Sequence, residues 1–423
     1  MKTGFSTAKR LVEPSESNCE IAPVQAAAKL GSRFDKCPRV LILSHEIPNT
    51  LNAGSILLHR LFRNWPADRL LVVGPELPSA AERLTCEYVT FRPRMMRLET
   101  SRFAAFSRLL TLSGCRSICS QPVNNEKHFN FDIVLTVMQN LAYSDAAYRM
   151  SEKYGIPLVV IVHDDPEDFE ASYAWTLPLI RRRNAYIYRR AVLRFCISPE
   201  MRDMLSLRYG APGEVMYPNR SESLVARPAE ESLSLKNPNL LTVGYAGALS
   251  YGYGQRLQEL VPVFRQAGVQ LRIYSRNTPT FEAGDVVSYH GCFRTPEEIF
   301  ERIKNECDAV ILPYCYPQHG HQALYRTHFP SKLPEYLALG MPVLISGPDY
   351  ATGVKWGIQN QEACIVITEQ FGPTWLKTLA SLKARPDLRS KLAVAAVTIG
   401  NRHFDPKAIT NSFNRNLCSL SVK

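Results

Sequence analysis

Three side chains suited to binding a polar, charged ligand stand close together late in the chain. Ser331, Lys332 and Glu335 follow Pro330, within the stretch of residues 308–347. An apolar run, DAVILP, opens this stretch and a second one, MPVLIS, closes it, which is typical of buried parallel strands. Between them we expect a polar loop and a helix with Pro330 in its first turn and Ser331 as its cap. Because free N–H groups at a helix start bind anions, the pattern predicts an anion site at the carboxyl end of a strand.

A second group of titratable side chains follows another apolar run. His163, Asp164 and Asp165 come directly after PLVVIV, which predicts a buried strand over residues 157–162. At the carboxyl end of a strand, such groups can act in acid–base catalysis or bind a substrate. A histidine that caps the next element, followed by two loop carboxylates, gives the same pattern, so both interpretations are open.

The loop before the expected helix carries three histidines, His319, His321 and His328. No cysteine or carboxylate pattern completes a tetrahedral set around them, so we predict neither a metal site nor a cofactor. The 11 cysteines are scattered and form no CxxC pair, which is typical of reduced thiols in a cytosolic protein.

The elements that must hold these groups alternate between apolar strands and helices. At least six alternations cover residues 39–219, and the pattern restarts after a polar, proline-bearing segment at residues 220–238. Near-uniformly apolar strands predict parallel sheets with both faces covered. The predicted fold class is therefore α/β, with two Rossmann-like, doubly wound domains that face a central cleft.

The predicted domain plan has five parts. Residues 1–38 form a loosely ordered leader, residues 39–219 the first domain and residues 220–238 a linker. Residues 239–400 form the second domain. Residues 401–423 are predicted to form a C-terminal helix that packs back on the first domain.

The first strand of each predicted domain leads into a loop that contains a glycine. Gly54 comes shortly after VLILS, and Gly247 ends TVGYAG. A glycine in such a loop lets the backbone approach a phosphate, although a simple tight turn gives the same pattern. Neither loop has the GxGxxG spacing, which argues against a dinucleotide-binding protein.

The chain carries a formal net charge of +11, part of it in arginine-rich segments at residues 92–108 and 181–194. The first of these overlaps a basic helical region expected at residues 95–125. A solvated basic face explains the clusters, and so does attraction to an anionic membrane surface or a negatively charged substrate. Nucleic acid is not expected as a partner, because no nucleic-acid-binding signature accompanies the charge.

Hydropathy bears on where the protein works. No run approaches the ~18–20 apolar residues of a membrane span, and the N-terminal residues lack the apolar core of a secretory signal. We therefore expect a cytoplasmic protein, either free or peripheral on the cytoplasmic face of a membrane.

Three stretches resemble the GT-B glycosyltransferases, in particular the large retaining family called family four. They are residues 40–62, the segment 242–275 with TVGYAGALSYGYGQRLQELV and LRIYS, and the run from DAVILPY through FPSKLPEYLALGMPVLISGP. The resemblance covers about residues 40–417. It implies the GT-B fold, a nucleotide-diphosphate sugar as donor, and a glycan, a lipid-linked molecule or another acceptor, as in polysaccharide biosynthesis.

The resemblance also implies roles for individual residues. Glu335 matches a glutamate that accepts hydrogen bonds from the ribose hydroxyls, and Ser331 and Lys332 lie where the family holds phosphate. His163 matches a histidine that lines the sugar site, and with Asp164 it is our candidate for catalysis. The remaining donor-binding candidates are Gly54, Gly247, Arg256 and Arg276.

The chain departs from the family pattern at one position beside the expected sugar site. Family members have two glutamates eight residues apart, and Thr327 stands where the first is expected. The loop His319–His328 is a candidate source of replacement contacts. Two further hypotheses stay open: a degenerate GT-B protein that binds a glycan or partner without turnover, and a nucleotide-sugar epimerase.

Overall fold

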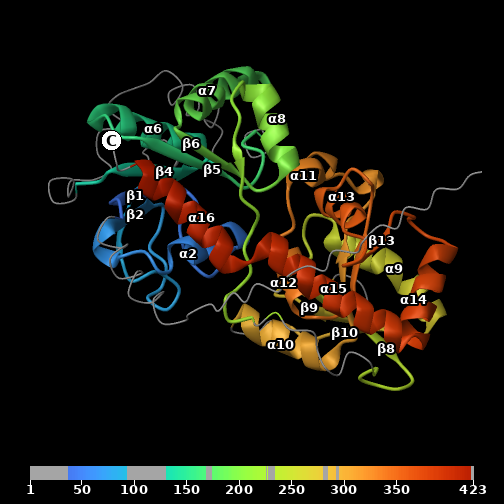
Figure 1. Ribbon diagram of the computed structural model, residues 1–423. Coiled ribbons are helices and arrows are strands. Elements are labelled where there is room, and N and C mark those ends of the chain that lie inside the picture. Colours follow the sequence, from blue (N-terminus) through green and yellow to red (C-terminus); the bar gives the residue numbers. More distant parts are fainter. Residues whose placement is uncertain are drawn as a thin grey trace, which may run out of the picture. The chain divides into compact units, whose positions relative to one another are not determined.

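The strands of the computed structural model form two separate sheets (Figure 1). The structure describes residues 37–92, 130–167, 174–224, 226, 234–279, 284–291 and 295–420. Within those residues one sheet has seven strands, the other has six, and the strand pairings are parallel. The predicted α/β class with two doubly wound sheets is confirmed.

The first sheet is built from β1 (Val40–Leu43), β2 (Leu70–Gly74), β3 (Glu87–Thr90), β4 (Ile133–Val137), β5 (Leu158–Val162), β6 (Leu193–Cys196) and β7 (Glu214–Val215). Their order is β3-β2-β1-β4-β5-β6-β7. β1, β2, β4 and β5 are buried along their whole length, as their continuous apolar sequences require. The order reverses between β1 and β4, and this switch point is where sheets of this type bind ligands.

Helices cover the first sheet on both faces: α2 (Ala53–Phe62), α6 (Leu141–Tyr154), α7 (Leu177–Arg190) and α8 (Pro199–Tyr209), with short 3₁₀ turns η1 (Ala67–Arg69) and η4 (Ala174–Thr176). Right-handed crossovers put α2 on one face, and α6 and α7 on the other (Figure 1). Ser198 caps α8 by accepting a 3.0 Å hydrogen bond from the Met201 N–H. The arginine-rich helix α7 begins only at Leu177, because η4 precedes it.

The second sheet is built from β8 (Leu241–Ala246), β9 (Val269–Tyr274), β10 (Val287–Tyr289), β11 (Ala309–Pro313), β12 (Val343–Ser346) and β13 (Ile365–Ile367). Their order is β10-β9-β8-β11-β12-β13, so its switch point lies between β8 and β11. The connecting helices are α9 (Tyr253–Ala267), α10 (Pro296–Glu306), α11 (Gln322–Thr327), α12 (Lys332–Ala338), α13 (Thr352–Gln359) and α14 (Pro373–Ala384).

Several elements of the second sheet differ from the sequence-based expectation. The stretch between β11 and α12, expected to be a plain loop, contains the 3₁₀ turn η6 (Pro317–His319) and the short helix α11. α13 was not predicted, because TGVKWGIQ has two glycines and the pattern of a loop. The Thr295 hydroxyl caps α10 by accepting a hydrogen bond from the Glu298 N–H.

Two helices end the described chain: α15 (Pro386–Phe404) and α16 (Pro406–Ser419). Asp405 separates them and caps α16 by accepting a 2.7 Å hydrogen bond from the Ala408 N–H. Phe413 of α16 packs 5.3 Å, between ring centres, from both Phe62 of α2 and Phe195 of β6. The C-terminal helix therefore lies against the α2 face of the first sheet (Figure 1).

We call residues 38–219 the first half and residues 239–400 the second half. Strands of the first sheet end at Val215 and those of the second begin at Leu241, while Pro38–Lys423 group together as one unit by their contacts. The exact domain boundaries stay a prediction. The helix expected at residues 95–125 and most of the 1–38 leader lie outside the described residues. No helix among the described residues is long and apolar enough to cross a membrane.

Candidate functional site

Lys332 lies at the carboxyl-end edge of the second sheet. It is the first residue of α12, and its Nζ donates a 2.9 Å hydrogen bond to the Tyr245 hydroxyl. The same ammonium lies 4.1 Å from the centre of the Tyr253 ring and 4.9 Å from that of Tyr245. Because Tyr245 belongs to β8 and Tyr253 opens α9, three neighbouring elements hold this cation between aromatic rings.

The Lys332 ammonium has no carboxylate partner among the residues that the structure describes. Burial alone lowers its pKa from the usual 10.5 to about 7. The residue nevertheless keeps part of its surface exposed. A cation that is desolvated, lacks a protein counter-ion and can be reached from solvent is suited to a ligand with negative charge.

Gly247 makes the room that the Lys332 side chain occupies. It follows β8, has a φ of +129°, and donates its N–H to the Tyr274 carbonyl at 3.0 Å. A Cβ on this residue would overlap Cε of Lys332. The predicted glycine loop is therefore present, and it is filled by the lysine that faces it.

Replacing Gly247 by alanine is expected to lower the free energy of unfolding by about 2 kcal/mol, because the new methyl strains the backbone and displaces Lys332. Gly320→Ala is the matched control, since Gly320 also has a positive φ of +79° but has open space around its Cβ position. Urea unfolding of both variants measures the difference. Equal losses would show that backbone strain alone decides the effect.

Glu335 is already paired with the first half. Its Oε1 accepts a 2.6 Å hydrogen bond from Nη2 of Arg60 in α2, and a 3.3 Å bond from the Ser221 N–H. Oε2 accepts a longer bond of 3.4 Å from the same N–H. Burial raises the pKa of this carboxyl, and Arg60 and the Ser221 N–H oppose that rise. The residue assigned to ribose thus also forms an ion pair between the two halves.

The start of α12 differs from the prediction. Ser331 has a helical backbone (φ −60°, ψ −19°) and its side chain makes no capping hydrogen bond, so its expected role as a cap is wrong. The Leu333 N–H donates to the Pro330 carbonyl at 3.1 Å and is not free for a ligand. α12 has only seven residues. Lys332, more than the helix terminus, therefore gives this edge its positive charge.

His163 and Asp164 follow β5 and meet a residue of the second half. Nδ1 of His328 and Oδ1 of Asp164 lie 2.9 Å apart. Burial is the largest influence on Asp164 and disfavours its charge, but the hydrogen bond from His328 and the electrostatic interactions with His328 and His163 together lower the pKa of the carboxyl. Burial lowers the pKa of His163, and its buried Nε2 has no hydrogen-bond partner among the described residues. An ionised aspartate and a neutral histidine therefore stand side by side.

Gly54 lets His163 approach the first helix. It is the second residue of α2, and a Cβ there would lie 2.8 Å from Nδ1 of His163. The space that we assigned to a ligand phosphate is thus taken by an imidazole ring. Glu46 contributes to the same cluster, because its charge acts on His163 and its carboxylate accepts from the Ser55 hydroxyl.

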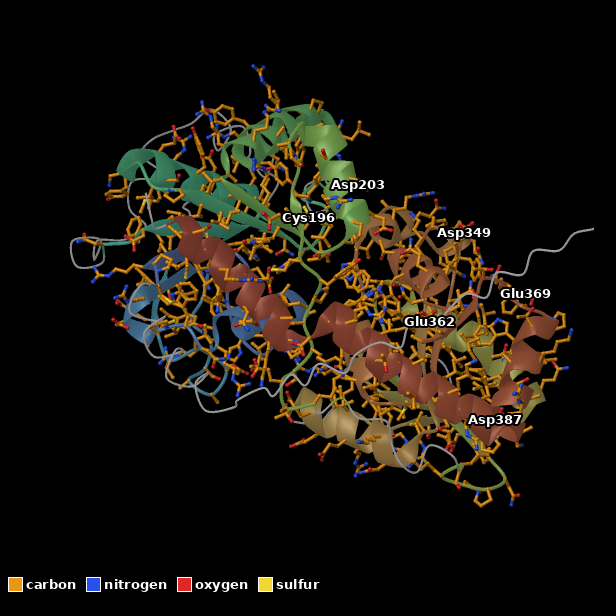
Figure 2. All side chains as sticks on the ribbon, in the orientation of Figure 1. Cys196, Asp203, Asp349, Glu362, Glu369 and Asp387 are labelled. Carbon is orange, nitrogen blue, oxygen red and sulfur yellow. The ribbon has the colours of Figure 1, made fainter. Side chains whose placement is uncertain are left out.

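The segment around Thr327 touches the carboxyl-end edge of the first sheet. The Ser198 hydroxyl donates a 2.7 Å hydrogen bond to the Thr327 carbonyl. Cys196, labelled in Figure 2, is the last residue of β6 and pairs in register with Val162 of β5. His163 and Ser198 therefore lie at one edge, and the segment that lacks the expected glutamate is fixed against it.

Tyr253 connects the two groups of residues. Its ring faces the Lys332 ammonium. Burial is the main cause that raises the pKa of Tyr253, and the charges of Cys315 and Asp164 raise it further. Tyr253 therefore contacts the Lys332 ammonium and also responds to the charge of Asp164.

Arg256 and Arg276 are placed differently from each other. Arg256 is completely buried, donates to Glu259 at 2.9 Å and to the Gln370 carbonyl at 2.7 Å, and packs its guanidinium over the Tyr316 ring. These internal partners hold it away from a ligand. Arg276 follows β9 and is exposed. The structure does not bring either arginine to Lys332, and a contact of Arg276 with the donor stays a prediction.

The other loop residues have separate environments. His319 pairs with Glu259 at 2.5 Å, and His321 has a left-handed backbone (φ +63°). Asp165 pairs with Arg208 at 2.7 Å, which makes it a structural carboxylate. In the part of the chain that the structure describes, no group of three or more His, Cys, Asp or Glu side chains could hold a metal ion.

Known structures provide the comparison that decides the fold. HepE of Anabaena, in complex with UDP and glucose, has a TM-score of 0.60 at 15% identity, over 90% of this chain and 100% of its own. The chain has the GT-B fold. Sucrose-phosphate synthase from Thermosynechococcus elongatus gives 0.61 at 13% identity, and a glycosyltransferase from Rickettsia africae gives 0.58 at 11%. These cover 90% and 91% of this chain, and 98% and 99% of their own. The sequence matches no protein-family model and no curated protein.

Sequence reasoning missed several residues of this candidate site. Tyr245 and Tyr253, eight positions apart in TVGYAGALSYGYG, were inside a stretch that we singled out, and a repeated tyrosine beside a glycine loop was a usable signal. Arg60 and Ser221 could not be recognised from any sequence signal, because their partner Glu335 lies far away in the chain. His328 was noted only as one member of a histidine-rich loop.

Proposed function

We propose that this protein transfers a sugar from a nucleotide-diphosphate donor to an acceptor hydroxyl. The observation that carries the proposal is the Lys332 ammonium, desolvated between Tyr245 and Tyr253 and without a carboxylate partner among the described residues. A diphosphate supplies the missing negative charge. The GT-B likeness to HepE, whose structures contain UDP, UDP-glucose or UDP and glucose, supports a nucleotide sugar as the ligand.

In the proposed reaction, the bond between the sugar C1 and the diphosphate oxygen breaks, and a bond from C1 to the acceptor oxygen forms. The acceptor loses its proton to the departing diphosphate. Lys332 stabilises the negative charge that grows on that group, because a preorganised cation in a partly dry site acts strongly on developing charge. Retention of the C1 configuration is part of the proposal and rests on the family resemblance.

Asp164 and His163 are proposed to act on the sugar side. Asp164 is ionised and held by His328, and it adjoins the segment where Thr327 replaces the expected glutamate. Its carboxylate is therefore suited to accept hydrogen bonds from sugar hydroxyls and to stabilise positive charge at C1. His163, neutral and with an unpartnered Nε2, is suited to a further sugar hydroxyl.

Asp164→Asn is expected to lower kcat about 100-fold and to leave the affinity for the nucleotide diphosphate unchanged, because the lost charge faces the sugar. His319→Asn is the matched control, since His319 lies in the loop that leads to His328 but pairs with Glu259. Steady-state transfer or donor hydrolysis, together with calorimetric titration of the diphosphate, separates the two effects. Equal losses of affinity and kcat in the Asp164 variant would contradict a sugar-side role.

A panel of nucleotides tests the proposal as a whole. We expect tight binding of at least one of UDP, GDP or ADP in a thermal-shift or calorimetric titration, followed by slow hydrolysis of the corresponding nucleotide sugar. Binding without any turnover favours the degenerate GT-B hypothesis. Release of an epimerised sugar favours the epimerase hypothesis. No binding across the panel would overturn the proposal.

The acceptor is proposed to be a glycan or a lipid-linked molecule, consistent with polysaccharide biosynthesis at the cytoplasmic face of a membrane. The support is the basic character of the first half, where α7 carries five arginines and no acidic residue in LPLIRRRNAYIYRR. A charged surface of this kind raises the local concentration of an anionic acceptor.

A further inference from the structure

The first turn of α7 and the 3₁₀ turn before it expose large apolar side chains. Trp175 is 58% exposed and Leu179 is 45% exposed. The sequence has four tryptophans, and the other three, Trp65, Trp356 and Trp375, are buried. An exposed tryptophan four residues before an exposed leucine forms an apolar tip on this helix.

The same face of α7 continues with arginines. Leu179, Arg182, Tyr186 and Arg190 follow one another at spacings of three and four residues, so they share one side of the helix. Arg181 and Arg183 pair with Glu167 and Asp145, which fixes them to the protein. Among the described residues, no carboxylate pairs with Arg182 or Arg190, and Arg190 lies over the Tyr186 ring.

The direction of α7 relates this face to the candidate site. β5, α7 and β6 follow one another in the chain, and β5 and β6 are parallel neighbours. α7 therefore begins at the carboxyl-end edge of the sheet and runs back toward the amino-end edge. His163 and Asp164 follow β5 at that same carboxyl-end edge. The apolar tip thus lies on the side of the first half where the candidate chemistry is.

We propose that this face of α7 docks on an anionic membrane surface, with Trp175 and Leu179 inserted among the lipids and Arg182 and Arg190 against the headgroups. An exposed tryptophan suits the interface between water and hydrocarbon, because its ring is amphipathic. Arginines without a carboxylate partner are attracted to anionic lipid, and this helix has no acidic residue to oppose them. Docking in this way brings His163 and Asp164, the proposed sugar-side residues, toward the bilayer surface, a consequence that rests on the proposed function.

Vesicle binding of the full chain tests the proposal. We expect co-sedimentation with vesicles of phosphatidylcholine mixed with phosphatidylglycerol, and little with phosphatidylcholine alone. Arg182→Gln/Arg190→Gln should weaken binding about tenfold. The matched control is Arg265→Gln/Arg302→Gln, which removes the same charge from side chains of the second half that are 55% and 50% exposed. If both double variants lose vesicle binding equally, the net charge of the protein explains the binding and the proposal is overturned.

Tryptophan fluorescence gives an independent readout. Because Trp175 is the exposed member of the four tryptophans, brominated lipid in the anionic vesicles should quench it and shift its emission to the blue, and Trp175→Phe should remove this response. Equal binding to soluble heparin or duplex DNA, without quenching by brominated lipid, would assign the face to a soluble polyanion and overturn the membrane proposal. Nucleotide binding without vesicles should be unchanged in all these variants, so a failure of the proposed function is seen separately.

Discussion

Lys332→Met is expected to lower the affinity for the nucleotide diphosphate about 100-fold while leaving the folded state at least as stable as before. The two effects have one cause. The ammonium is desolvated between Tyr245 and Tyr253 and has no carboxylate partner among the described residues, so the unliganded protein gains little from its charge. Methionine fills a similar volume without that cost, whereas the diphosphate loses the cation that faces it.

The measurement pairs calorimetric titration of the diphosphate with urea unfolding of the unliganded protein. Lys304→Met is the control, because Lys304 is also partly exposed but lies on α10, outside the site. If the Lys332 variant binds the diphosphate as tightly as the unaltered chain does, Lys332 has no role in binding phosphate. An Lys332 variant that unfolds more easily shows instead that the lysine stabilises the unliganded fold.

The pKa of Lys332 also gives this prediction a pH dependence. In the folded protein the pKa is lowered to about 7, whereas in the unfolded chain it is close to 10.5. Between these values the unfolded chain binds more protons, so this group makes the protein more stable as pH rises through that window. Diphosphate affinity should change in the opposite direction and weaken above pH 7, because the ligand needs the protonated amine. In Lys332→Met both contributions should be missing.

Arg60→Met is expected to lower the free energy of unfolding by about 3 kcal/mol, since it leaves the buried Glu335 carboxylate without its charged partner. The side chains of Arg60 and Glu335 are 17% and 5% exposed, and their ion pair measures 2.6 Å. Arg60 also donates a 2.6 Å hydrogen bond to the Asn219 carbonyl. Its replacement therefore removes a hydrogen bond at the end of the first half as well. Adding Glu335→Gln to Arg60→Met should restore most of the stability, because the remaining amide carries no charge.

Urea unfolding of the two single variants and the double variant gives the coupling energy of the pair. Arg302→Met is the control, since Arg302 and Glu306 form a pair of 3.5 Å whose side chains are 50% and 26% exposed, and such pairs contribute about 0.5 kcal/mol. The pKa of Glu335 is already raised by burial, and in Arg60→Met it should rise further. The single variant should therefore regain stability as pH falls toward that pKa. Additive losses in the double variant would mean that the ion pair contributes nothing of its own.

Much of the fold followed from local patterns. Continuous apolar runs such as LLVVG and LVVIV were recognised as buried parallel strands, because no alternation with polar residues was present. The helix starts at Ser198–Pro199 and Thr295–Pro296 can be recognised from the sequence, since capping depends on neighbouring residues. α11 and α13 were missed, because helices this short are stabilised by tertiary contacts rather than by propensity.

The candidate site could be predicted only in part. The strand ends pointed to His163, Asp164, Gly247, Lys332 and Glu335, because parallel topology puts all carboxyl ends at one edge. The partners of these residues could not be found in the same way. Arg60, Ser198 and His328 reach their partners across the fold, and pairing at such sequence separations leaves no periodic signal. Arg256 was misjudged for a related reason: a basic residue after a glycine loop resembles a phosphate ligand, while its burial depends on distant rings.

The Arg60–Glu335 pair limits how the two halves can be exchanged between relatives. Glu335 belongs to the half that carries Lys332, and Arg60 belongs to the half that carries His163 and Asp164. A chimera that joins this first half to another protein's second half must also bring a carboxylate at the position of Glu335, or Arg60 is left without its counter-ion. The two halves of this chain are therefore not independently exchangeable, because one ion pair joins them.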